Sequence, residues 1–343
     1  MISKAELVKW FQLEYPDLVH QMKQCSHHYD RKNLNPYHLE DDVFTHTMMV
    51  LDNVNMHVKR DGYLVAVAAL LHDIGKPFTR EVNQEKKRVS FFGHESVSAF
   101  GALDICRKLG LTKRDTIIVF KLISLHTEGF KLSTEDFINR LVNFKEADLL
   151  LDLIKADNDG RYTEVNSEFD PYGVLYNLKR KVAEPKEKTL TLMVGLPASG
   201  KSTLTYALTQ NRFDTFVVSR DNILMTNTQG DTYDEKWKNA DQKQIDHLLQ
   251  ESIKRSKEHG YNNVYVDMTN LSRKSRRKIL NQYSSKIYTK KAIVKLNYLE
   301  TLKERLLGRE SKTIPSHVLD NMMKSFYLPL YDEGFDEIEY VLD

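Results

Sequence analysis

The segment GLPASGKST at residues 195–203 restricts the fold of this chain more than any other feature, because it has the glycine and lysine spacing of a phosphate-binding loop. An apolar run, TLTLMVGL, leads into this loop, and a helix-forming run, KSTLTYALTQ, leads out of it. The glycines allow backbone N–H groups to surround phosphate oxygens, and the helix N-terminus faces the anion. The segment therefore predicts a site for ATP or another nucleoside triphosphate.

Two side chains in the loop are expected to contact the nucleotide and its metal ion. The Lys201 ammonium can reach the β- and γ-phosphates, and the Ser202 hydroxyl can ligate Mg²⁺. The alternative is a chance match within an ordinary strand–turn–helix unit. We expect the nucleotide to be bound by six residues of the loop: Gly195, Ser199, Gly200, Lys201, Ser202 and Thr203.

The sequence around the loop predicts an α/β domain at residues 189–343. Short runs rich in β-branched residues recur there between helix-like segments, a pattern typical of a parallel sheet with both faces covered. These runs are TLTLMVGL (189–196), TFVVSRD (215–221), NNVYVDM (262–268) and AIVKLNY (292–298).

Residues 1–180 follow a different pattern and predict an all-α domain. Apolar residues recur there at helical spacing. The clearest runs are TMMVLDNVNMHV (47–58), YLVAVAALLHD (63–73), SVSAFGALDICRKLG (96–110) and DTIIVFKLISLH (115–126). Between the two domains, a charged stretch that contains Pro185 predicts a linker at residues 181–188.

The overall composition agrees with two soluble domains. The chain has 343 residues, 41% of them hydrophobic, and its net charge of +2 means that any basic surface for nucleic acid must be local. It has two cysteines, Cys25 and Cys106, and no apolar run of signal-peptide or membrane-spanning type. We therefore expect a cytoplasmic protein without a membrane partner.

Two acidic residues follow predicted strands of the α/β domain. Asp221 comes after TFVVSR and can accept a proton from an attacking hydroxyl at the edge where open α/β sheets bind ligands. Asp267 ends the next strand and can order metal or water in the manner of a Walker-B acid. Either residue can instead be a helix cap, an alternative that the sequence leaves open.

The segment ETLKERLLGRESKTIPSHVL places Arg305 and Arg309 four residues apart, on one face of a predicted helix. Two such arginines can close over a triphosphate as a lid and stabilise the charge of the transition state. The alternative is a solvated basic surface. The run RKSRRK at residues 273–278 presents the same choice, between a grip on a nucleic-acid backbone and a solvated surface.

Taken together, GLPASGKST, SRD, DMTNLS and the paired arginines before P-x-x-V-L resemble the kinase domain of 5′-hydroxyl polynucleotide kinases over residues 188–343. The resemblance implies that Asp221 is the general base for a 5′-OH, that Lys201 and the arginines of the lid engage phosphates, and that Arg220 assists. One departure is Leu224, which stands where some relatives have an arginine for the acceptor's 3′-phosphate.

A second constellation lies in the helical half. His46, the adjacent pair His72 and Asp73, and Asp157 supply the imidazole and carboxylate ligands that suit a divalent transition metal able to activate water. Because adjacent helix positions diverge by about 100°, a metal held by both His72 and Asp73 must lie beside the helix end. A single histidine here can equally be a satisfied core residue.

The segments HTMMVLDN, LLHDIGKPFTR, FFGHESVSA and KADNDGR resemble the HD phosphohydrolase superfamily over about residues 35–165, an all-helical fold also found attached to some tRNA nucleotidyltransferases. The resemblance implies His46, His72, Asp73 and Asp157 as metal ligands, and His94 and His126 as ligands of a second metal or as a polar wall. We expect Lys76 to hold a substrate phosphate, with Arg80 and Arg161 as further options. Three earlier histidines receive no role: His27, His28 and His38.

The combination resembles bifunctional HD-Pnk enzymes of nucleic-acid end repair. It implies ATP-dependent phosphorylation of a 5′-OH and removal of a 2′-phosphate, a 3′-phosphate or a 2′,3′-cyclic phosphate from RNA or DNA ends, with a ligase acting afterwards. Two alternatives stay open: a kinase for a small molecule or a tRNA-linked metabolite with an HD domain that acts on nucleotides, and a kinase with a non-catalytic, RNA-binding helical half. The sequence also leaves open whether the protein is a homo-oligomer.

Overall fold

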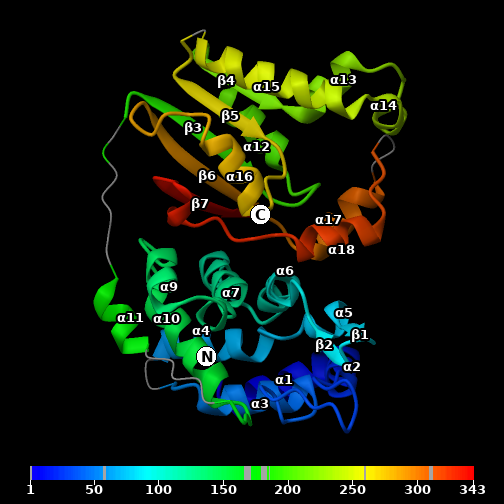
Figure 1. Ribbon diagram of the computed structural model, residues 1–343, viewed down its shortest axis with the longest axis vertical. Helices are drawn as coiled ribbons and strands as arrows, with labels where there is room; N and C mark the ends of the chain where they lie inside the picture. Colours follow the sequence, from blue (N-terminus) through cyan, green and yellow to red (C-terminus); the bar gives the residue numbers. More distant parts are fainter. Residues whose placement is uncertain are drawn as a thin grey trace. The chain divides into compact units, whose positions relative to one another are not determined.

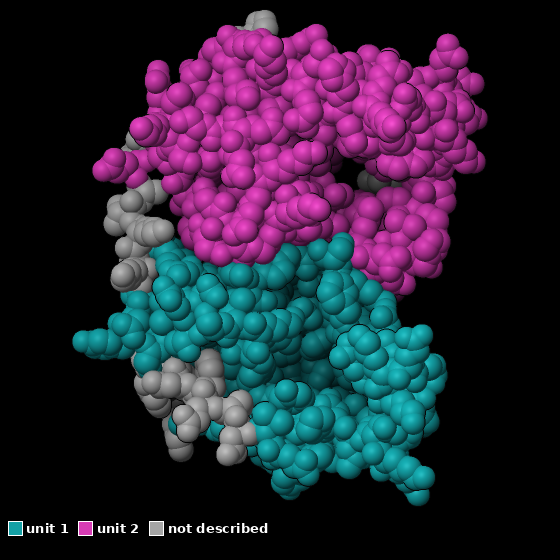
Figure 2. All heavy atoms as spheres, in the orientation of Figure 1, with its two compact units in different colours: residues 1–180, 323–328 teal, residues 181–322, 329–343 magenta. Residues whose placement is uncertain are grey.

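The computed structural model describes residues 2–56, 59–165, 171–178, 184, 186–258, 260–308 and 312–343. The chain folds into two compact units, which are coloured separately in Figure 2. The helical unit comprises residues 1–180 and 323–328, and the α/β unit comprises residues 181–322 and 329–343.

The helical unit consists mainly of helices in its described residues (Figure 1). In chain order its elements are α1 (Lys4–Glu14), α2 (Pro16–Gln24), α3 (Val43–Asn53), α4 (Lys59–Leu71), α5 (Lys76–Thr79), β1 (Glu81–Asn83), β2 (Arg88–Ser90), α6 (His94–Lys108), α7 (Lys113–Leu125), α8 (Glu128–Lys131), α9 (Thr134–Arg140), α10 (Ala147–Asp159) and α11 (Pro171–Asn177).

Helix α4 lies at the centre of this unit because its sequence is apolar on every side. From Leu64 to Leu71 every residue is buried, and α4 packs against α3, α7 and α10. Because other helices enclose α4, the residues that follow its last turn also lie in the interior of the unit. The pair His72 and Asp73 follows directly, and neither side chain is more than 1% exposed.

A short segment from late in the chain, residues 323–328, belongs to the helical unit. Phe326 places its ring edge-to-face against Phe100 of α6 and Phe120 of α7, with centroid distances of 5.1 and 5.9 Å. The Ser96 hydroxyl donates a hydrogen bond of 2.7 Å to the Phe326 carbonyl. The unit thus differs from the predicted domain limits, because this aromatic side chain completes a core formed by much earlier helices.

The α/β unit contains the remaining elements. They are β3 (Lys188–Val194), α12 (Lys201–Thr209), β4 (Thr215–Ser219), α13 (Arg220–Asn227), α14 (Tyr233–Asn239), α15 (Gln242–Glu258), β5 (Asn263–Asp267), α16 (Arg273–Leu280), β6 (Tyr288–Leu296), α17 (Leu299–Leu307), α18 (Ser316–Lys324), the 3₁₀-helix η1 (Tyr331–Glu333) and β7 (Glu337–Leu342). Helix α18 crosses the boundary between the two units.

Among the described residues, the sheet has five strands in the order β4-β5-β3-β6-β7, and every pairing is parallel. The central strand β3 is buried from Leu190 to Val194, as expected for a parallel strand with both faces covered. On one face, Met193 packs with Tyr265 and Ile293 against Leu204 of α12. The all-α and α/β fold classes predicted from the sequence are therefore confirmed.

Several boundaries differ from the sequence-based prediction. Helix α3 ends at Asn53, so the run predicted at 47–58 continues past it, and residues 57 and 58 lie outside the described part. The hairpin β1–β2 and the edge strand β7 were not predicted. In the linker predicted at 181–188, Lys188 already begins β3, and the backbone N–H of Lys186 donates to the Thr289 hydroxyl. Among the described residues, no helix combines the length and apolarity needed to cross a membrane.

Replacing Phe326 by alanine should destabilise the helical unit by about 3–5 kcal/mol, because it empties a buried aromatic site between two helices. The chain has two tryptophans, one in each unit, so a Trp237→Phe background leaves Trp10 as the only tryptophan reporter, in the helical unit. Urea unfolding followed by Trp10 fluorescence measures the change. Phe213→Ala, at a fully exposed position, is the control, and an unshifted Trp10 transition in Phe326→Ala would contradict the packing.

Candidate functional site

The carboxylate of Asp73 lies at the centre of the imidazole cluster in the helical unit. Its Oδ2 is 3.1 Å from Nε2 of His72 and 3.6 Å from Nε2 of His46. Its Oδ1 is 3.3 Å from Nε2 of His94 and 3.8 Å from Nε2 of His126. The two oxygens therefore face two different pairs of imidazoles.

Four helices bring these groups to the end of α4. His46 lies on α3, a helix capped by Asp42, whose side chain accepts a hydrogen bond from the Thr45 N–H. His94 is the first residue of α6, His126 follows the last residue of α7, and Asp157 lies in the last turn of α10. Nε2 of His46 is 3.2 Å from Oδ1 of Asp157. All six predicted metal-ligand positions of this half thus lie together, although their roles as ligands stay a prediction.

Three imidazoles are oriented by their own backbone. In each, Nδ1 is placed to donate to the carbonyl oxygen three residues earlier, which leaves the Nε2 lone pair directed at the cluster. These contacts measure 2.7 Å from His72 to Ala69, 2.7 Å from His94 to Phe91 and 2.8 Å from His126 to Ile123. The local backbone thus favours the tautomer that a metal ligand requires.

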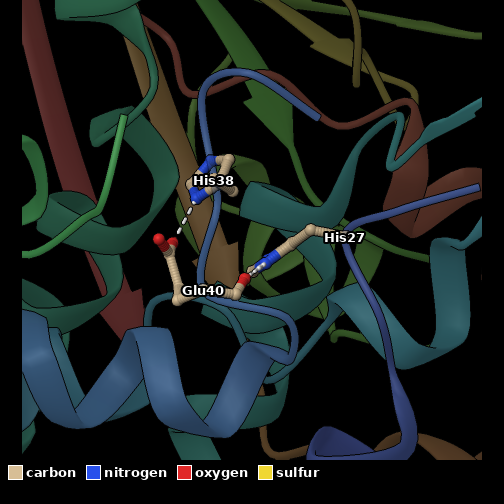
Figure 3. A group of neighbouring side chains, drawn as sticks. All are labelled: His27, His38 and Glu40. Carbon is tan, nitrogen blue, oxygen red and sulfur yellow. Dashed lines mark hydrogen bonds and ion pairs between the residues drawn. The ribbon is translucent and has the colours of Figure 1, made fainter. Parts of the chain in front are cut away.

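The fourth imidazole, His46, is held by a carboxylate. Its Nδ1 lies 3.0 Å from Oε1 of Glu40, and the same oxygen is 2.8 Å from Nδ1 of His38. Figure 3 shows both His38 and His27 directed at Glu40, His38 at the carboxylate and His27 at the backbone oxygen. Glu40 is buried and also accepts a hydrogen bond from the Tyr162 N–H. It therefore belongs to a layer that surrounds the cluster and orients His46.

The buried atoms of the cluster fit a bound cation. Within the described residues, Nε2 of His46 and Nε2 of His72 are buried without a hydrogen-bond partner, and the buried Asp73 carboxylate has only ion-pair contacts. Buried polar atoms are normally paired, and imidazole with carboxylate is a donor set that suits divalent transition metals. Donor atoms of His46, His72 and Asp73 lie within 4.8 Å of one another, as do those of Asp73, His94 and His126.

The electrostatics of the cluster also favour positive charge. Burial alone lowers the pKa of His46, but the carboxylates of Asp157 and Glu40 outweigh burial and raise this pKa to about 9. Burial alone raises the pKa of Asp157, yet the neighbouring imidazoles hold it well below its usual range. An environment that stabilises a buried imidazolium and two ionised carboxylates attracts a metal cation for the same reason.

Lys76 begins α5 and is buried beside the cluster. Its ammonium lies 2.7 Å from Oδ2 of Asp73 and 3.2 Å from Nε2 of His27. The two arginines considered with it are engaged elsewhere. Arg80 donates to the carbonyls of Ser26 and His28, and Arg161 donates to the Asn158 side chain. Among these three cations, Lys76 is thus the one in direct contact with the cluster.

In the α/β unit, the loop after β3 has the backbone that phosphate binding needs. Gly195 has φ +152° and Gly200, the N-cap of α12, has φ +92°, both in the region that favours glycine. Lys201 is buried and its ammonium donates to the Leu196 carbonyl at 2.7 Å, while Ser202 is exposed. Ser199 is also buried, and Thr203 is exposed.

Asp221 and Asp267 lie at the same edge of the sheet, because Ser219 of β4 pairs with Asp267 of β5. Asp221 is not the cap of α13, since the Ser219 hydroxyl accepts the capping hydrogen bond from Asn222. Its carboxylate instead accepts hydrogen bonds from the Tyr233 hydroxyl at 2.9 Å and from Lys312 at 2.5 Å. The capping alternative for Asp221 is therefore wrong.

Arg305 of α17 donates to the Ala198 carbonyl at 3.2 Å and so touches the phosphate loop. Its predicted partner Arg309 lies outside the described residues. Sequence reasoning missed Lys295 at the end of β6, which forms an ion pair with Asp343 beside this loop. The Asp343 carboxylate also lies 3.5 Å from Arg305.

The basic run at residues 273–278 is only partly available as a surface for nucleic acid. Arg276 is fully buried and forms a two-point ion pair with Glu333, at 2.8 and 2.7 Å. Arg273 donates to Asp332 at 2.6 Å. Neither of the two alternatives, a grip on a nucleic-acid backbone or a solvated surface, holds for the whole run, because two of its arginines are bound within the fold.

Two protein-family models match this sequence. The family model described as HD domain matches residues 43–154, and the family model described as AAA domain (AAA_33) matches residues 190–329. The chain contains an HD domain followed by a P-loop AAA domain. The predicted HD domain and the predicted P-loop kinase-like domain are thereby confirmed, whereas the particular reactions stay proposals.

Individual relatives cover only parts of the chain. An A-adding tRNA nucleotidyltransferase of Deinococcus radiodurans is 28% identical over 150 residues, which span 43% of this chain and 34% of the relative. A chain of the Pnkp1/Rnl/Hen1 complex matches with a TM-score of 0.29 at 22% identity, over 39% of this chain and 43% of that chain. A gluconokinase of Sinorhizobium meliloti 1021 matches with a TM-score of 0.30 at 17% identity, over 46% of this chain and 84% of that chain.

We predict that the HD domain binds a divalent transition metal and that Asp73→Asn abolishes this binding, since the substitution removes the charge that both imidazole pairs face. Saturating metal at about a hundred times its dissociation constant should stabilise the domain by about 2.7 kcal/mol. Elemental analysis and thermal unfolding, with and without a chelator, measure the two effects. Full metal occupancy in a folded Asp73→Asn protein would refute the assignment.

Glu40→Gln should lower the metal affinity of the HD domain by about tenfold to a hundredfold, because His46 loses the carboxylate that orients it. Competition with a chromophoric chelator measures the affinity. Glu81→Gln, at an exposed position in β1, is the matched control and should leave the affinity unchanged. Equal affinities for the two variants would mean that Glu40 does not position His46.

Proposed function

We propose that this chain heals broken nucleic-acid ends, with its P-loop domain phosphorylating a 5′-OH and its HD domain removing phosphate from the other end. The observation that supports the proposal is the presence, in one chain, of two separate clusters of side chains that suit phosphate chemistry. One is the imidazole–carboxylate cluster around Asp73, and the other is the loop at Lys201 with Asp221 at the same sheet edge.

In the HD domain, the metal would be held by His46, His72, Asp73 and Asp157, with His94 and His126 completing a second position. Such a metal supplies Lewis-acid activation of water and of a phosphoryl oxygen. The chain itself keeps the Nε2 atoms directed at the cluster through the backbone carbonyls and Glu40. Lys76, whose ammonium lies 2.7 Å from Oδ2 of Asp73, would bind a phosphate oxygen of a 2′-phosphate, a 3′-phosphate or a 2′,3′-cyclic phosphate.

In the P-loop domain, the acceptor hydroxyl would attack the γ-phosphorus of ATP, ADP would leave, and the hydroxyl proton would pass to Asp221. The backbone N–H groups around Gly195 and Gly200, with Lys201 and Arg305, would balance the charge of the phosphoryl group. Mg²⁺ at the Ser202 hydroxyl would supply further neutralisation. The role of Arg309 in the lid stays a prediction, because this residue lies outside the described residues.

These two reactions produce a 5′-phosphate and a 3′-hydroxyl, which are the ends that a ligase joins. A ligase acting on the product is therefore the expected partner. The tRNA in the name of the curated relative supports RNA as the substrate. A cytoplasmic location and a homo-oligomer stay predictions.

The decisive test uses one oligoribonucleotide that carries a 5′-OH and a 2′,3′-cyclic phosphate, incubated with ATP and a series of divalent metals. We expect both ends to be converted by the wild-type protein. Lys201→Ala should abolish only the reaction at the 5′ end, and Asp73→Ala only the reaction at the other end. Loss of both reactions from either single change would contradict two separate centres.

Asp221→Asn should lower kcat of the 5′ reaction by about a hundredfold to ten-thousandfold, because the amide cannot accept the hydroxyl proton. Affinity for ATP, measured by equilibrium titration, should stay close to that of the wild type. Phosphate transfer from ATP to a small polyol or another metabolite, with none to any oligonucleotide, would favour the small-molecule kinase instead.

A further inference from the structure

Helix α14 (Tyr233–Asn239) buries none of its residues, yet it carries two aromatic side chains next to the proposed general base. Tyr233 and Trp237 are four positions apart and share one face of the helix. Their ring centroids are 6.2 Å apart, with planes only 18° from parallel. Trp237 remains 46% exposed, so the core of the domain does not account for it.

Each ring also lies against a cation. The Arg220 guanidinium is 5.4 Å from the Trp237 ring centroid, and the Lys312 ammonium is 4.0 Å from the Tyr233 ring centroid. Arg220 is in turn held by Gln242 at 2.7 Å. Aromatic faces beside basic side chains are the combination with which proteins bind unpaired bases and their phosphates.

Tyr233 of the aromatic pair is linked to Asp221 both directly and through Lys312, which lies on its ring. The Tyr233 hydroxyl donates to Oδ1 of Asp221, and Lys312 donates to Oδ2. Arg220, which packs on Trp237, is the chain neighbour of Asp221. An acceptor whose hydroxyl reaches Asp221 is therefore adjacent to Tyr233, whose ring lies against that of Trp237.

The position of α14 is itself fixed. A capping box formed by Thr232 and Glu235 starts the helix, and the Thr313 N–H donates to the Asp234 carboxylate at 3.1 Å. The segment that contains Lys312 is therefore tied to the same helix as the two rings. A rigid aromatic surface loses little conformational entropy when a flat ligand stacks on it.

We propose that Trp237, supported by Tyr233 and Arg220, stacks on the nucleobase of the 5′-terminal nucleotide of the acceptor. This inference rests on the proposed kinase function and narrows its substrate: the acceptor is recognised through its terminal base. Stacking is tolerant of base identity, so the surface selects nucleic-acid ends without selecting a sequence.

The test compares two 5′-OH oligonucleotides that differ only in whether the terminal nucleotide carries its base or is abasic. For the wild type we expect loss of the base to raise KM by about five- to 150-fold with little change in kcat, the range that corresponds to stacking of one base. Trp237→Ala should show the raised KM with both substrates, and Trp237→Phe should recover most of the discrimination. Phe213→Ala, which removes another exposed aromatic of this domain, is the control and should discriminate as the wild type does.

A second readout needs no turnover. In a Trp10→Phe protein, Trp237 is the only tryptophan, so its fluorescence should be quenched by the oligonucleotide with a terminal base and much less by the abasic one. Equal KM values of the wild-type protein for both substrates, or unchanged discrimination in Trp237→Ala, would overturn the inference while leaving the kinase assignment intact. Failure of the wild type to phosphorylate any oligonucleotide would overturn the proposed function itself.

Discussion

The buried carboxylate of Asp73 is the constraint on which the helical domain depends. It is 1% exposed, and neither oxygen has a hydrogen-bond partner among the described residues, although Lys76 forms an ion pair with Oδ2 at 2.7 Å. An ionised carboxylate in such a place is strongly unfavourable unless other groups compensate its charge. The imidazoles at the ends of three surrounding helices face it, and a cation between them would add to the compensation that Lys76 supplies. The need to compensate the Asp73 carboxylate thus accounts both for the imidazoles that these helices place at the end of α4 and for the chemistry of the site.

The second domain is organised by a geometric constraint, since parallel strands end at a common edge. Gly195 directly follows β3, Asp221 is the second residue after β4, and Asp267 ends β5. Lys295 and Asp343 bring charge to the same edge from β6 and from the residue after β7. The phosphate-loop motif belongs to one strand–loop–helix unit, but the site at this edge contains residues from the ends of all five described strands.

Sequence reasoning succeeded where a residue's neighbours lie within its own motif. The loop at Gly195 and the pair at His72 are defined by local spacing, so both could be predicted together with the fold classes, whereas His94 and His126 were implied only by the resemblance to the HD superfamily. Glu40 could not be predicted, because its contact with His46 depends on how the preceding loop folds back onto α3, as in the hydrogen bond from the Val43 N–H to the Cys25 carbonyl. The place of Phe326 in the helical core could not be predicted for the same reason, since its partners lie more than two hundred positions earlier in the chain.

In the basic run at residues 273–278, partners distant in the sequence likewise determine what an arginine does. Arg276 is enclosed with Glu333, and it donates to the carbonyls of Asn270 and Leu271 at 3.0 and 2.8 Å. The Asn270 amide in turn donates to the Met193 carbonyl, two residues before Gly195. A buried ion pair of this kind contributes little net stability, but its two-point geometry fixes the atoms that it joins. The arginine that looked like a contact for nucleic acid therefore supports the turn on which the phosphate loop rests.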